Sequence, residues 1–145
     1  MTEIAFHFNV VDKLDYACRL LRKAYRSGAQ VAVTGPAGLL GRLDAALWSF
    51  DPLDFLPHVR CAAGQSLEPR MAGTPLVLVE RAQDAAHRGV LVNLGTEVPL
   101  GFESFERLIE IVGSDDEDRQ AGRQRWKHFV DRGYAIERHE VRASS

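Results

Sequence analysis

The stretch IAFHFNVVDKLDYACRLLRKAYRSGAQVAVTG (Ile4–Gly35) decides the fold class of this chain. Mixed apolar and polar residues at 4–11, with both phenylalanines on one face, predict a β-strand. Apolar residues then recur at helical spacing over 14–25, which predicts an amphipathic helix with Asp12 as its N-cap. Residues 30–35 predict a short buried strand. A strand, a helix and a strand joined by tight connections are typical of a parallel β–α–β unit.

The rest of the chain continues to alternate between helical and extended patterns. Residues 101–113 fit either one helix or a helical turn followed by a strand, and the β-branched residues before Gly113 favour the second. Ser114 and Glu117 have the spacing of a capping box at the start of the last helix. The further predicted elements are a helix from Pro36 to Phe50, strands at 75–80 and 90–95, a helix at 114–132 and a strand at 134–141, with 51–58 as a turn-rich connection, 61–74 as a loop and 81–89 as a turn with a short helical piece. This order predicts a single α/β domain over 1–145, with a central, mostly parallel sheet flanked by helices.

Composition and charge exclude several classes of protein. The 145 residues are 46% apolar and 26% charged, close to a globular average. The net charge of −2 argues against a protein that coats DNA through its phosphates, so any basic site is local. The longest apolar runs are far short of the ~20 residues that a membrane-spanning helix needs. With only two cysteines, Cys18 and Cys61, we expect reduced thiols in a cytoplasmic, soluble protein.

The residue types that carry catalysis are present without the spacing that catalysis needs. The five histidines are scattered, with no metal-ligand spacing, and the acidic run Asp115–Asp118 fits helix capping better than acid–base chemistry. We therefore expect no catalytic residue, no metal and no cofactor. The turn GPAGLLGR (Gly35–Arg42) resembles a phosphate-binding loop, but Arg42 and Leu43 replace the lysine and hydroxyl. A small nucleotide-binding regulator or enzyme that uses the Gly35–Gly41 turn remains the alternative.

The predicted last helix carries a tryptophan among cations. Arg119, Arg123, Trp126, Lys127 and Val130 follow one another at i, i+4, i+7, i+8 and i+11, so they share one helix face. One interpretation is a packed tryptophan whose cationic neighbours extend into solvent. The other is a pocket for a carboxylate beside an apolar group, since arginine matches two carboxylate oxygens and tryptophan gives a flat apolar wall.

A second candidate surface is the segment LDAALWSFDPLDFLPH (Leu43–His58). It has more apolar bulk than one helix face and its exit turn can easily bury. The segment is therefore either plain core or an exposed apolar patch that another chain covers.

At these segments the sequence resembles the chi subunit family of bacterial DNA polymerase III. The matching stretches are the opening FHF, RSGAQVAV (Arg26–Val33), LDAALWSFDPLDFLPH and QRWKHFVDRGY (Gln124–Tyr134). The resemblance implies a Rossmann-like fold without a functional nucleotide site and without chemistry of its own. It also implies a role in DNA replication, with two protein partners. These partners are the psi subunit, which leads to the clamp loader, and the C-terminal tail of single-stranded-DNA-binding protein.

Site residues follow from the same resemblance by position. The family more often has tyrosine at Trp126 and lysine at Arg119, so both are departures that keep the chemistry. Single-stranded DNA would be met only through its binding protein. The tail site would use Val112, Arg119, Arg123, Trp126 and Lys127, and the psi site would use Trp48, Leu53, Phe55, Leu56 and Pro57.

Overall fold

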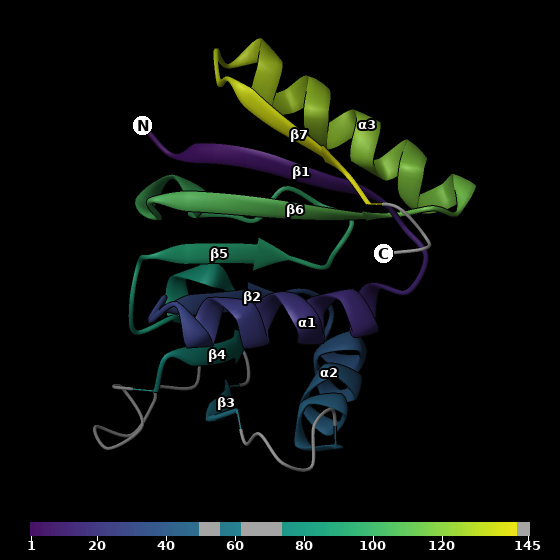
Figure 1. Cartoon of the computed structure of the whole chain (residues 1–145). Helices are drawn as coiled ribbons and strands as arrows, with labels where there is room; N and C mark the ends of the chain where they lie inside the picture. Colours follow the sequence, from purple (N-terminus) through teal and green to yellow (C-terminus); the bar gives the residue numbers. More distant parts are fainter. Residues whose placement is uncertain (50–55, 62–73, 142–145) are drawn as a thin grey trace.

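Seven parallel strands form one sheet in the computed structural model, which describes residues 1–49, 56–61 and 74–141 (Figure 1). The sheet order is β3-β4-β2-β5-β6-β1-β7. The strands are β1 (Glu3–Val10), β2 (Val31–Thr34), β3 (His58–Cys61), β4 (Leu76–Val79), β5 (Val90–Asn93), β6 (Arg107–Gly113) and β7 (Ile136–Glu140). The helices are α1 (Lys13–Arg26), α2 (Ala37–Ser49) and α3 (Asp116–Asp131), with short 3-10 helices η2 (Ala82–Asp84) and η3 (Phe102–Ser104). The expected α/β class is confirmed, and every strand pairing in these residues is parallel.

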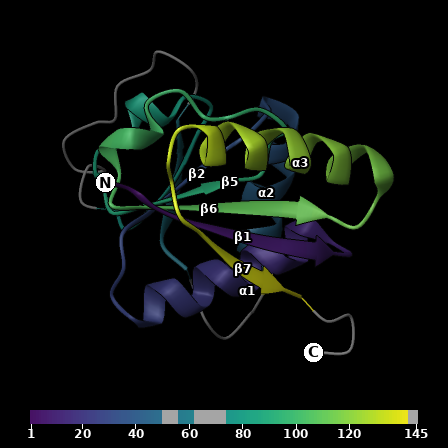
Figure 2. The same ribbon diagram turned by 90° about the horizontal axis from the view of Figure 1, so that it is seen from above.

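The helices cover both faces of the sheet (Figure 2). Leu21 of α1 and Leu43 of α2 pack in one core cluster with Val33 of β2. Phe129 of α3 packs in a second cluster, which contains Ala32 from the opposite face of the same strand. Because both faces are covered, strands such as β2 and β4 read as continuous apolar runs.

The first β–α–β unit is wider than the sequence pattern indicates. Strands β1 and β2 are parallel and joined by α1, as predicted, but β6 and β5 lie between them. Asp12 caps α1 by accepting a hydrogen bond from the Asp15 amide at 3.1 Å, also as predicted. The local pattern thus identifies the crossover but not the number of strands that it spans, because later parts of the chain fill the gap.

Two local predictions are wrong. The sequence predicts a turn-rich connection at 51–58 and a loop at 61–74, but His58–Cys61 forms the edge strand β3, and residues 62–73 of the predicted loop lie outside the described residues. This strand has four residues and one fully buried side chain, too few to show a period. The N-cap of α3 is Asp115 rather than Ser114, since the Asp115 carboxylate accepts from the Asp118 amide at 3.1 Å. The helical turn followed by a strand within 101–113 is confirmed as η3 and β6.

A buried ion pair holds α3 on the sheet. Arg125 Nε of α3 lies 3.0 Å from Glu110 Oε1 of β6, and the two side chains are 2% and 0% exposed. Asn93 of β5 donates to the same oxygen at 2.8 Å, and Arg125 Nη1 donates to the Thr96 carbonyl at 3.0 Å. Burial raises the pKa of Glu110 to about 7, and the Arg125 guanidinium acts in the opposite direction. The pair therefore fixes which side of α3 faces the sheet.

Removing the cation of this pair should be strongly destabilising. We expect Arg125→Met to lower the free energy of unfolding by about 3–5 kcal/mol, because Glu110 is left buried without its cation. Urea denaturation followed by circular dichroism measures the loss, with Lys127→Met on the exposed side of α3 as the matched control. A loss no larger than that of the control would contradict the assigned role.

His7 of β1 should make the free energy of unfolding depend on pH. Its ring hydrogen-bonds to the Tyr16 hydroxyl and lies 4.8 Å from the His139 ring of β7. Burial, followed by the nearby His139 and Arg107, lowers the pKa of His7 from 6.5 to about 4. The unfolded chain therefore takes up this proton at higher pH than the folded chain, so acidification through this window favours unfolding.

The measurement is the free energy of unfolding of the wild type and of His7→Gln between pH 7 and pH 4. We expect the difference between the two proteins to shrink as the pH falls from 6.5 towards about 4. A difference that stays constant over this range would contradict the assignment.

Candidate functional site

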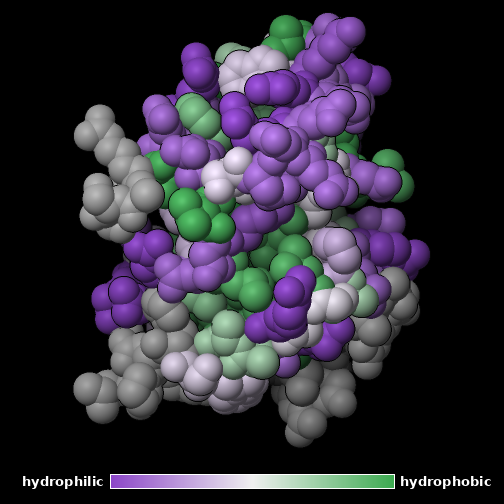
Figure 3. Space-filling model, turned by 90° about the vertical axis from the view of Figure 1, so that its right-hand side faces the viewer, coloured by the Kyte–Doolittle hydropathy of each residue, from purple (hydrophilic) through white to green (hydrophobic). Residues whose placement is uncertain are grey.

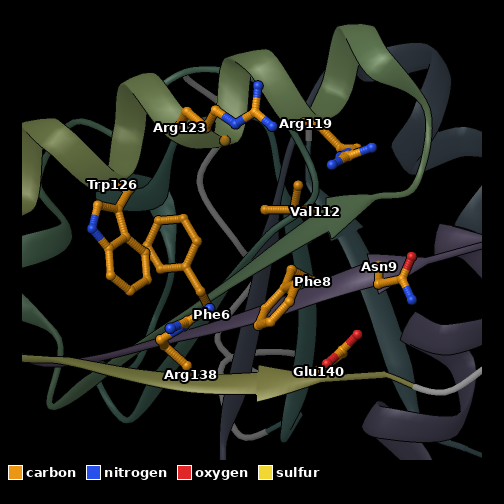
Figure 4. A pocket seen from close by; sticks show the side chains of 10 residues that line it. Phe6, Phe8, Asn9, Val112, Arg119, Arg123, Trp126, Arg138 and Glu140 are labelled. Atoms are coloured by element: carbon orange, nitrogen blue, oxygen red, sulfur yellow. The ribbon is translucent and has the colours of Figure 1, made fainter.

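A hollow of about 570 Å³ lies between α3 and the edge strand β7 (Figure 4). Strands β1 and β6 contribute side chains between these two walls. Its lining consists of Phe6, Phe8, Asn9, Val112, Arg119, Gly122, Arg123, Trp126, Arg138 and Glu140. The strand β1 therefore meets three elements that follow one another much later in the chain, β6, α3 and β7, at this one place.

The floor of the hollow is apolar because α3 sits very close to β6. A Cβ on Gly122 would lie 2.9 Å from Val112 Cγ1, so only glycine permits this approach. Next to this contact, the Trp126 ring meets the Phe6 ring edge-on at 5.1 Å between centroids. Phe8 continues the apolar surface along β1 (Figure 4). The result is an apolar recess large enough to take a side chain.

Three guanidinium groups surround this recess. Arg119 lies 3.9 Å from Asp116, and its side chain is about half exposed. Arg138 reaches over two rings, with its Cζ 5.6 Å from the Phe8 centroid and 5.9 Å from the Trp126 centroid. Within the described residues, Arg123 and Arg138 have no carboxylate within 4.0 Å. Both line the hollow with their positive charge unneutralised, which suits a ligand that carries carboxylates and an apolar group.

The structure brings together four of the five residues predicted for the tail site. Val112, Arg119, Arg123 and Trp126 all line the hollow. Lys127 is exposed on α3 and is not part of this lining.

Sequence reasoning missed the β7 wall of the hollow. Successive side chains of a strand point to opposite faces of the sheet, so Arg138 and Glu140 share one face of the predicted last strand. The period does not show that this face meets α3. That information comes from the pairing of β7 with β1, in which Phe6 lies beside Arg138 and Phe8 beside Glu140.

The second predicted surface is described in part. Trp48, in the last turn of α2, is 59% exposed and lies 4.9 Å from the His58 ring. Asp44 holds that histidine at 2.9 Å. Pro57 is half-buried, whereas Leu56 is 1% exposed and belongs to the core beneath α2. Leu53 and Phe55 lie outside the described residues.

The Gly35–Gly41 turn is used for packing. A Cβ on Gly35 would lie 3.5 Å from the Gly95 nitrogen, and one on Gly41 would lie 3.2 Å from Arg60 Nη1. Arg60 also donates to the Ala37 carbonyl at 3.0 Å. The glycines therefore let neighbouring elements approach this turn, as expected for a tight strand-to-helix connection.

The strands point to the right in Figure 1, so the carboxyl end of the sheet is the face that Figure 3 turns towards the viewer. Doubly wound folds bind their ligands at this end of the sheet. Apolar side chains gather in its middle within a mostly hydrophilic rim (Figure 3). Lys13 donates to the Leu94 carbonyl at 2.7 Å and to Asp118 at 3.1 Å, which ties β5 to the starts of α1 and α3.

In the described ranges, no three His, Cys, Asp or Glu side chains form a metal-binding group, and no helix is long and apolar enough to cross a membrane.

Comparison with known proteins gives a consistent result. The family model described as "DNA polymerase III chi subunit, HolC" matches residues 1–137. DNA polymerase III subunit chi of Pseudomonas aeruginosa is 33% identical over 130 residues, which cover 89% of this chain and 87% of the relative. The subunit of the same name in Haemophilus influenzae is 28% identical over 129 residues, 88% of this chain and 86% of the relative. That of Escherichia coli is 26% identical over 121 residues, 82% of this chain and 79% of the relative.

Proposed function

The chain belongs to the DNA polymerase III chi subunit family, and from this premise we propose that it binds the C-terminal tail of single-stranded-DNA-binding protein in the hollow between α3 and β7. The family places the chain in a complex that replicates DNA. In that complex it would be a non-catalytic accessory subunit. It would link single-stranded-DNA-binding protein, through the psi subunit, to the clamp loader.

The observation that carries this proposal is the pair of unneutralised arginines, Arg123 and Arg138, beside an aromatic floor. The expected ligand is a peptide that ends in an apolar residue with a free carboxylate, preceded by acidic residues. Arg123 would bind the terminal carboxylate, because its planar guanidinium matches two oxygens. Trp126 and Val112 would enclose the terminal side chain. Arg119 and Lys127 would attract the preceding acidic residues, mainly assisting association.

Loss of Arg123 should weaken tail binding most. We expect Arg123→Ala to cost about 2 kcal/mol or more of binding free energy, since the ligand carboxylate would be desolvated without a partner. Arg119→Ala should cost less, and its effect should fade in high salt because exposed charges are screened. Isothermal titration calorimetry with a short tail peptide measures both, with Arg42→Ala on α2 as an exposed control.

The same titration tests whether the carboxylate itself is recognised. A tail peptide with an amidated C-terminus should bind far more weakly than the free acid. Equal affinities for the two peptides would contradict the role given to Arg123.

We further propose that the surface around Trp48 binds the psi subunit. An exposed tryptophan is a typical interface anchor, and the half-buried Pro57 directly precedes His58, whose ring lies 4.9 Å from Trp48. This surface lies on α2, which packs with α1 in one core cluster, whereas α3 packs in the cluster on the other face of the sheet. Both partners could therefore be bound at once.

Replacing this tryptophan should affect partner capture rather than stability. We expect Trp48→Ala to weaken binding to purified psi by about 2 kcal/mol or more, as for an interface anchor. The free energy of unfolding should change by only about 0.5 kcal/mol, as for an exposed position. Leu100→Ala, at another exposed apolar side chain, is the control. Unchanged psi binding with a large loss of stability would return Trp48 to the core.

The alternative function is nucleotide binding at the Gly35–Gly41 turn. Nucleotide binding at this turn is disfavoured, because Arg60 and Gly95 already pack against its glycines. A nucleotide titration separates the two proposals, because nucleotide binding without tail-peptide binding would favour the alternative.

A further inference from the structure

We propose that Arg138 of β7 is a specificity-determining residue of the hollow, which binds an acidic side chain of the ligand from the wall opposite α3. The inference rests on the proposed function of the hollow as a peptide site. It adds a cation that the predicted site lacked. The ligand would then be held between two cationic walls, and a peptide with only its terminal carboxylate would bind less well.

The position of Arg138 is fixed by strand pairing. In the parallel ladder between β1 and β7, Arg138 pairs with Phe6 and Glu140 pairs with Phe8. Its guanidinium lies across the rings of Phe8 and Trp126, at 5.6 and 5.9 Å from their centroids. An arginine that rests on aromatic faces loses little further freedom when it binds, while the edge of its planar group keeps its hydrogen-bond donors available.

The charge of Arg138 is not used inside the described part of the molecule. None of the described carboxylates forms an ion pair with it. Glu137, its neighbour in β7, instead lies 3.5 Å from Arg107. Arg138 faces the hollow together with Arg119 and Arg123, which extend from α3 on the other side (Figure 4). A carboxylate that enters the hollow would therefore meet donors from both walls.

Glu140 makes the charge of the β7 wall differ between its two ends. It lies two residues after Arg138 on the same side of β7, roughly 7 Å further along the strand. Figure 4 shows Glu140 near Asn9, at the end of the hollow away from Trp126. A ligand carboxylate is attracted by Arg138 and repelled by Glu140. The acidic residue of the ligand should therefore lie at the Trp126 end of the hollow.

The test is calorimetry with a free-acid tail peptide and with peptides in which each acidic residue is changed, one at a time, to its amide. We expect Arg138→Gln to weaken binding of the acidic peptide about tenfold, the size of one charged hydrogen bond. One amide peptide should bind the wild type more weakly but bind the wild type and Arg138→Gln alike. Arg138→Lys should recover part of the affinity, and Glu140→Gln should raise it.

The matched control is His139→Gln, which changes β7 on the face away from the hollow. Circular dichroism melting checks that each variant folds. If Arg138→Gln binds every peptide as the wild type does, while Arg123→Ala weakens binding, the inference is wrong and the proposed function stands. If the wild type binds no tail peptide, both are wrong.

Discussion

The ion pair between Glu110 and Arg125 is the interaction on which the candidate site depends. It is fully buried, and Glu110 Oε2 and Arg125 Nη2 have no hydrogen-bond partner, so it adds little stability compared with apolar residues in the same place. Its effect is geometric. With Arg125 directed at β6, Gly122 one turn earlier and Phe129 one turn later also face the sheet. The flanking positions of α3, which carry the arginines and the tryptophan, then overlook β1 and β7.

The close contact between Gly122 and Val112 completes this arrangement. It brings α3 down onto β6, while β7 lies beyond β1 at the edge of the sheet, and the hollow is the space between them. The surface around Trp48 belongs to α2, whose buried side chains lie in the core cluster on the opposite face of the sheet. One proposed binding surface on each face of the sheet would let the proposed adaptor hold two partners at once.

Much of the fold, and most of one wall of the site, could be predicted from the sequence. Helical spacing and the Asp12 cap identified α1, and the spacing of Arg119, Arg123 and Trp126 identified a shared helix face. The strand order could not be predicted, because it depends on contacts between distant segments. Nor could the burial of Arg125, since charged residues are rarely buried and only the partner Glu110 on β6 permits it. Arg138 was missed because it joins the site only through the pairing of β7 with β1, which is again a contact between distant segments.

The two tryptophans, one at each proposed surface, provide the most direct test of this account. Their indole N–H signals can be followed separately by NMR while a free-acid tail peptide is added to the 15N-labelled protein. The account predicts that the Trp126 signal shifts to saturation and that the Trp48 signal stays in place. A shift of Trp48 with Trp126 unchanged would contradict the placement of the tail between α3 and β7.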